Sequence, residues 1–204
     1  MEKRGNGRNK TMRERIALEA GRLMAEDGVR DYALAKRKAA LHLAAADTQN
    51  MPSNQEIEQA LIDYQRLFQR DSQPHALKKR RELAVQAMQF FADFHPRLVG
   101  AVLNGTAGVH SDIDLHVFSD TPEAVALFLM EHNVPYQHGE RRLRVGRDQL
   151  QTCTVFRFVA DDIGVDLTVF PLTGMRQAPL SPVDGKPMRR ASVEAVRKLA
   201  GERY

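Results

Sequence analysis

Residues 98–118, LVGAVLNGTAGVHSDIDLHVF, place two glycines before a pair of aspartates. Gly100 ends an apolar run, Gly105 follows, and Asp112-Ile113-Asp114 opens a stretch in which polar and apolar residues alternate. Such alternation predicts a β-strand over residues 112–118, in which every second side chain points to the same face. Asp112 and Asp114 are therefore expected to project together.

Two neighbouring carboxylates repel each other unless a cation lies between them. Their oxygen atoms suit Mg²⁺ or Mn²⁺, which completes its shell with phosphate oxygens and water. Asp166 stands at the start of a second apolar stretch, residues 165–169, and could complete a two-metal site with Asp112 and Asp114. Gly100 and Gly105 suit a backbone turn whose N–H groups approach phosphate.

The surrounding pattern predicts an α+β protein, with a helical N-terminal region followed by a small mixed β-sheet and flanking helices. We expect a helical region over residues 1–95, a catalytic domain over 96–175 and a C-terminal loop and helix over 176–204. Helices are predicted at residues 11–25, at 32–45, from the Ser53–Glu56 capping box through apolar positions up to Leu67, at 76–94 after a break at 70–75, at 122–132 and at 192–199. Strands are predicted at residues 97–103, 112–118, 141–145, 151–160 and 165–170, the last two joined by a turn at 161–164.

Charge is distributed unevenly along the chain of 204 residues, whose net charge is +4. Residues 1–95 hold 17 lysines and arginines against 13 aspartates and glutamates, whereas residues 96–204 are balanced. The basic half predicts an anionic partner, RNA above all, with a solvated helical surface as the alternative. The lysine and arginine runs at 36–38 and 78–81 are its best candidates.

Composition points to a cytoplasmic protein. Hydrophobic residues make up 43% and charged residues 27%, as in ordinary globular proteins, and Cys153 is the single cysteine. No apolar run approaches the ~18 residues of a membrane span. The basic first ten residues are not followed by an apolar segment, so we expect neither a secretory signal nor membrane association.

The glycine and aspartate pattern resembles the DNA polymerase β-like nucleotidyltransferase superfamily, most closely its minimal nucleotidyltransferases. The resemblance rests on Gly100, Gly105, the Ser111-Asp112-Ile113-Asp114-Leu115 run and the strand containing Asp166. It covers about residues 97–171. It implies a metal-dependent enzyme that moves a nucleoside monophosphate from an NTP to an acceptor hydroxyl. The charge asymmetry, and not the resemblance, makes RNA, including a tRNA end, the preferred acceptor.

The resemblance also assigns roles to individual residues. Asp112 and Asp114 would bind Mg²⁺, Asp166 would complete the metal site and align the acceptor hydroxyl, and the glycines would shape the nucleotide-binding loop. The family's serine after the first glycine is Ala101 here, and Thr106 or Ser111 could supply the missing hydroxyl. A hydrogen bond lost to a charged group weakens binding by about 1.5–3 kcal/mol.

Ala101 keeps two alternatives open: a catalytically degenerate module that binds nucleotide or RNA, and an antitoxin-like partner protein. Further basic residues have two interpretations each. Arg141, Arg142, Arg144 and Arg147 could meet phosphate or form an exposed strand face, and the loop carrying Lys186, Arg189 and Arg190 could fold over the site. His116 lies on the same predicted strand face as Asp114, either bordering the site or half exposed.

Overall fold

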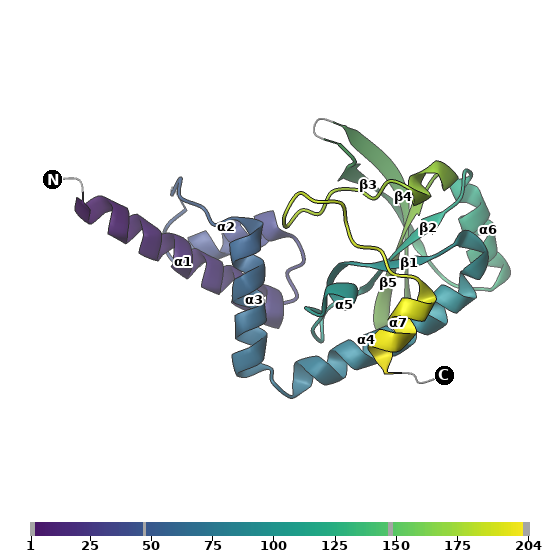
Figure 1. The fold of residues 1–204 in the computed structure, drawn as a ribbon, viewed down its shortest axis with the longest axis horizontal. Coiled ribbons are helices and arrows are strands. Elements are labelled where there is room, and N and C mark those ends of the chain that lie inside the picture. Colours follow the sequence, from purple (N-terminus) through teal and green to yellow (C-terminus); the bar gives the residue numbers. More distant parts are fainter. Residues whose placement is uncertain (1–2, 47, 147–148, 202–204) are drawn as a thin grey trace. The chain divides into compact units, whose positions relative to one another are not determined.

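The computed structural model describes the backbone of residues 3–46, 48–146 and 149–201, and side chains from Thr11 onward within these ranges. It is an α+β protein in which helices precede a mixed sheet, as predicted (Figure 1). The chain divides into two compact units. The first comprises Met1–Pro74, Gly108–His110 and Pro182–Asp184, and the second comprises His75–Ala107, Ser111–Ser181 and Gly185–Tyr204.

Among the described residues, the helices that lie wholly in the first unit are α1 (Lys3–Glu26), α2 (Tyr32–His42) and α3 (Asn54–Phe68). The predicted capping box is present: Ser53 Oγ accepts from the Glu56 N–H, and the Glu56 carboxylate accepts from the Ser53 N–H. Gly21 lets α1 and α3 approach closely, because a Cβ there would lie 2.7 Å from the Leu61 nitrogen. Small and aliphatic side chains fill the core, among them Ile16, Ala20, Leu23, Ala35, Ala39 and Ile57.

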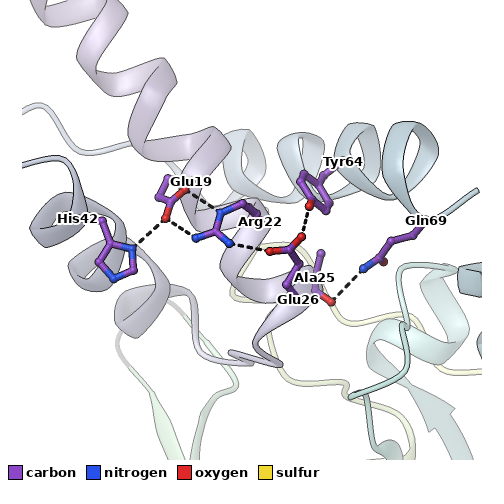
Figure 2. Close-up of polar contacts among 7 residues, drawn as sticks. All are labelled: Glu19, Arg22, Ala25, Glu26, His42, Tyr64 and Gln69. Carbon is purple, nitrogen blue, oxygen red and sulfur yellow. Dashed lines mark hydrogen bonds and ion pairs between the residues drawn. The ribbon is translucent and has the colours of Figure 1, made fainter.

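A polar network ties the three helices together (Figure 2). Arg22 donates to Glu19 on one side and to Glu26 on the other, both on α1. Glu19 also contacts His42 of α2, 2.9 Å away, and Glu26 accepts from the Tyr64 hydroxyl of α3. The pKa of Glu19 falls to about 2, chiefly because of the hydrogen bond from Arg22. The network thus links α1 to both α2 and α3 through charged side chains of α1.

The second unit is a five-stranded sheet with helices on one of its faces. Its elements are α4 (Ser72–Phe90), which begins just before the unit, β1 (Arg97–Val99), α5 (Gly100–Asn104), β2 (Ile113–Phe118), α6 (Pro122–Glu131), β3 (Gln137–Arg144), β4 (Leu150–Ala160), β5 (Ile163–Phe170) and α7 (Val193–Ala200), with short 3-10 turns at Ala92–Phe94 and Leu172–Met175.

The strands lie in the order β1-β2-β5-β4-β3, with β2 and β5 parallel and the other pairs antiparallel (Figure 1). Alternate residues of β2 and β5, such as Ile113, Leu115 and Leu167, are buried in one core with side chains of α4, α5, α6 and α7. The residues between them face the other side. There Phe118, Cys153 and Phe170 form a small separate cluster beside polar side chains.

Three predicted elements are corrected by the structure. The apolar run 97–103 is not one strand: β1 ends at Val99 and α5 begins at Gly100, whose φ of +70° breaks the extended backbone. The break at 70–75 is shorter, since α4 starts at Ser72 and holds Pro74 in its first turn, where a missing N–H is tolerated. The β4–β5 turn is only Asp161-Asp162, both at positive φ, and Gly164 belongs to β5.

Two boundaries also differ from the division expected at residues 95 and 176. α4 contributes Leu83, Ala84 and Met88 to the core of the sheet unit, and α7 contributes Val196 to the same core. Both helices therefore belong to the second unit. Buried apolar positions occur on either side of residue 95, so composition alone could not locate the division.

Candidate functional site

The parallel pairing of β2 and β5 brings the predicted acidic residues to one face of the sheet. Asp114 and Asp166 are direct partners in the register of these strands, and paired residues project to the same side. Asp112 immediately precedes β2, two residues before Asp114. The three carboxylates therefore gather on the sheet face opposite the helices.

Two glycines lie directly against the first two carboxylates. A Cβ at Gly164 would lie 2.5 Å from Asp112 Oδ1, so the bare backbone of β5 makes room for that side chain. A Cβ at Gly100 would lie 2.8 Å from Asp114 Oδ2, and Gly100 also has positive φ. The sequence predicts Gly164 in a turn, whereas the structure places it in β5, facing Asp112.

The segment expected to form a phosphate loop is a short helix and its cap. Ala101 lies inside α5, and Gly105 ends that helix with φ of +92°. The backbone N–H groups of Gly105 and Thr106 both donate to the Ala101 carbonyl, at 2.9 and 3.0 Å. The Ser111 carbonyl accepts from Arg80 Nε at 2.6 Å. These backbone groups hold α5 and the approach to β2 in place.

Asp166 is the most buried of the three aspartates, with 1% of its surface exposed. Its Oδ2 accepts from Arg141 Nη2 at 2.8 Å and from Arg157 Nε at 2.9 Å. Arg141 Nη1 also donates to Thr168 Oγ1 at 3.3 Å. The other oxygen, Oδ1, is buried without a hydrogen-bond partner. Sequence reasoning included Arg141 in a basic cluster but missed Arg157, a single charge within an apolar strand.

The carboxylates of this face fit a divalent cation that needs only one or two protein ligands. Within the described side chains, no group of three or more His, Cys, Asp and Glu residues lies close enough to hold a metal ion. Mg²⁺ needs fewer, since it commonly takes one or two carboxylates together with substrate phosphates. Asp112 and Asp114 meet that requirement, and the orphaned Asp166 Oδ1 offers one more oxygen. Oδ2 of Asp166 is already occupied by arginine.

The buried His116 and the half-buried Arg190 form a pair on the same sheet face as the aspartates. His116 is 3% exposed, so its predicted half exposure is wrong. Its Nδ1 accepts from Arg190 Nε at 3.0 Å, which leaves the ring proton on Nε2. Burial, followed by the charges of Arg190 and Arg141, lowers the pKa of His116 to about 3.

Arg190 anchors the C-terminal segment on this face. Its guanidinium lies over the rings of Phe118 and Phe170, 5.0 Å from each centroid, and donates to the Gly174 carbonyl at 2.7 Å. Burial lowers the Arg190 pKa to about 10. The segment expected to reach the site does so through Arg190, whereas Lys186 and Arg189 are exposed.

The predicted RNA-binding residues fall into two groups. Arg37, Lys38, Lys78 and Lys79 are exposed. Arg80 is buried and donates to the carbonyls of Ser111 and Ala76, while Arg81 donates to those of Val102 and Leu199. The run at 78–81 is therefore only half available, because helical periodicity turns Arg80 and Arg81 toward the protein. Arg147 lies outside the described residues.

Comparison with known proteins adds no relative: no protein-family model matches the chain, and neither does any curated protein. None of the helices in the described part of the chain is long and apolar enough to cross a membrane.

Proposed function

We propose that the chain is a metal-dependent nucleotidyltransferase that moves a nucleoside monophosphate from an NTP to an acceptor hydroxyl and releases pyrophosphate. One observation carries this proposal: Asp114 and Asp166 are register partners on parallel strands, with Asp112 on the same face. Three carboxylates on one sheet face, with glycine backbone against two of them, favour a site for cations and phosphates.

Asp112 and Asp114 would hold Mg²⁺ or Mn²⁺, which supplies charge neutralisation for a triphosphate when it is bound. The remaining work falls to protein groups. Asp166 Oδ1, buried and unpartnered, can accept the proton of an acceptor hydroxyl and orient its oxygen for in-line attack on the α-phosphorus. Catalysis of this kind depends mainly on positioning and electrostatics.

RNA, including a tRNA end, is the acceptor class that we propose, with the cytoplasm as its location. The support is the excess of basic residues in the first half of the chain and the exposure of Arg37, Lys38, Lys78 and Lys79. Phosphate contacts from such side chains give affinity that falls with salt. A small metabolite or a protein hydroxyl would need the same carboxylates, so the acceptor is tested separately from the transfer.

The test incubates the full-length protein with each α-³²P-labelled NTP, Mg²⁺ or Mn²⁺, and total cellular RNA and protein. Asp112→Asn and Asp114→Asn keep the side-chain shape and remove one charge each. We expect label on one macromolecular species with the unchanged protein and a loss of about 100-fold or more in both variants. Pyrophosphate release in the presence of cell extract checks for a small acceptor.

A catalytically inactive nucleotide-binding module is the second candidate. Two observations favour it: Ala101 replaces the hydroxyl expected from the resemblance, and Asp166 Oδ2 is engaged by two arginines. Metal-dependent NTP binding without label transfer or pyrophosphate release would select this function and overturn the enzyme proposal. A stable hetero-complex on co-purification would instead indicate the antitoxin-like partner.

A further inference from the structure

Two arginines from neighbouring strands converge on one buried carboxylate oxygen. Arg141 of β3 and Arg157 of β4 both donate to Oδ2 of Asp166, at 2.8 and 2.9 Å. Asp166 is 1% exposed, whereas the two arginine side chains are 33% and 46% exposed. Two positive charges thus meet one negative charge, and the excess lies on the solvent side.

The guanidinium groups of Arg141 and Arg157 have N–H donors that do not bind Asp166. An arginine has five N–H groups in a planar fork that matches the oxygens of a phosphate. Arg157 uses Nε for Asp166, and among the described residues its Nη1 and Nη2 make no hydrogen bond. Arg141 uses Nη2 for Asp166 and one long bond from Nη1 to Thr168. The open fork of Arg157 is therefore available to an anion.

The position of the pair relates it to the aspartates. In the order β2-β5-β4-β3, Asp166 lies on the strand between Asp114 and the strands that carry the arginines. Arg157 is the register partner of Asp166 on one side, as Asp114 is on the other. An anion bound by Arg141 and Arg157 would therefore compete with Asp166 for the same guanidinium groups, next to the acidic residues.

We propose that Arg141 and Arg157 bind the polyphosphate of a nucleotide, and that Asp166 is their internal counter-anion until the polyphosphate displaces it. The identity of the ligand as a nucleotide rests on the proposed function. Displacement frees Asp166 Oδ2 beside Asp114 when the polyphosphate is present. The third carboxylate thus becomes fully available only in the substrate complex, so the arginine pair is a substrate-operated control of the site.

Binding of inorganic tripolyphosphate to the full-length protein, in EDTA and at fixed ionic strength, tests the proposal by calorimetry. We expect saturable binding that Arg157→Gln and Arg141→Gln each weaken about tenfold or more. Arg142→Gln is the matched control: it removes the same charge from the next residue of β3, whose side chain is exposed on the opposite face. We expect its Kd to stay within about twofold, since an exposed charge is screened.

Asp166→Asn supplies the second arm, because it removes the competing charge and keeps the side-chain shape. We expect it to tighten tripolyphosphate binding about threefold or more. Circular dichroism checks that each variant is folded, and the half-exposed Arg157 keeps the test meaningful should Asp166→Asn unfold.

Three results would overturn the inference. The first is an equal loss in Arg142→Gln and Arg157→Gln, which would indicate general electrostatics. The second is weaker binding in a folded Asp166→Asn protein. The third is loss of single-stranded RNA binding in Arg157→Gln with tripolyphosphate binding unchanged, which would assign the arginines to an RNA backbone.

The assay contains no divalent metal and measures no transfer, so its outcome is separate from that of the proposed function. A protein that binds tripolyphosphate as expected but transfers no nucleotide upholds the arginine pair and removes the enzyme proposal. If the protein transfers nucleotide and Arg157→Gln leaves the KM for NTP unchanged, the enzyme proposal is upheld and the role of the arginine pair is overturned.

Discussion

At the scale of single residues, the aspartates of the candidate site depend on glycines that face them. Asp112 occupies the space that a side chain at position 164 would fill, and Asp114 lies equally close to position 100. Gly164 is the more informative of the two, because its φ lies outside the left-handed range and its backbone would accept alanine. Glycine at position 164 is therefore explained by the space that the Asp112 carboxylate occupies, and not by the backbone conformation.

Gly164→Ala is expected to displace the Asp112 carboxylate and to weaken Mn²⁺ binding about tenfold or more, with a parallel loss of nucleotidyl transfer. Fold stability should change by less than about 1 kcal/mol, because the gain from replacing glycine at a compatible backbone position opposes the cost of moving the Asp112 side chain. Calorimetric Mn²⁺ titration and urea unfolding measure the two quantities.

Gly139→Ala provides the matched control, since the nearest atom to its new Cβ is Arg157 Nη1 at an ordinary 3.7 Å. We expect its Mn²⁺ affinity to match that of the unchanged protein. If Gly164→Ala also bound Mn²⁺ normally while folded, Asp112 would not be a metal ligand.

At the scale of elements, local signals differ in how far they determine structure. The Ser53–Glu56 capping box is visible in sequence and present in the structure, because it needs only backbone groups within one helical turn. The run 97–103 contains no such signal. A short apolar stretch fits a strand or a buried helix equally well, and the change from β1 to α5 at Gly100 depends on tertiary contacts.

Ser53→Ala is expected to lower the free energy of unfolding by about 1 kcal/mol, since it removes the hydrogen bond to the Glu56 N–H. Urea unfolding followed by circular dichroism measures the change. Thr121→Ala is the control, because Thr121 is also an N-cap but its side chain makes no capping bond. Equal losses in both variants would show that the capping bond itself contributes nothing.

At the scale of the whole molecule, acid acts on the helical unit through the Glu19 carboxylate. Hydrogen bonding to Arg22 lowers the pKa of Glu19 to about 2, from an ordinary value of 4.5. Its stabilisation of the helical unit is therefore present above pH 4.5 and is lost as the pH falls toward 2. The partner Arg22 is 36% exposed, so solvent screening reduces the contribution to about 1 kcal/mol.

Glu19→Gln should accordingly lower the free energy of unfolding at pH 7 by about 1 kcal/mol. It should also reduce the loss of stability that the unchanged protein shows as the pH falls from 4.5 toward 2. Urea unfolding between pH 2 and 7 measures the effect. Glu131→Gln makes the same change at an exposed position of α6 in the other unit. If the free energy of unfolding fell as steeply with decreasing pH in Glu19→Gln as in the unchanged protein, Glu19 would not be the cause of that fall.

Sequence could predict the fold class, the order of the helices and strands except for α5, and the placement of the three aspartates at two strands, because each follows from periodicity or from residue type. It could not predict the Asp166–Arg157 pair, since Arg157 stands in β4 like any exposed strand residue and only the register brings it opposite Asp166. The burial of His116 was missed for a related reason: Arg190, distant in sequence, covers it.

The parallel pairing of β2 with β5 has a further consequence for how the molecule folds. The β4–β5 hairpin closes through a two-residue turn, whereas β2 meets β5 only after α6, β3 and β4 have intervened. Contacts this distant in sequence form slowly, because the chain loses conformational entropy before the contacts contribute any stabilising energy. We therefore expect the acidic face to be assembled late, and a nascent chain to lack this face until β5 is complete.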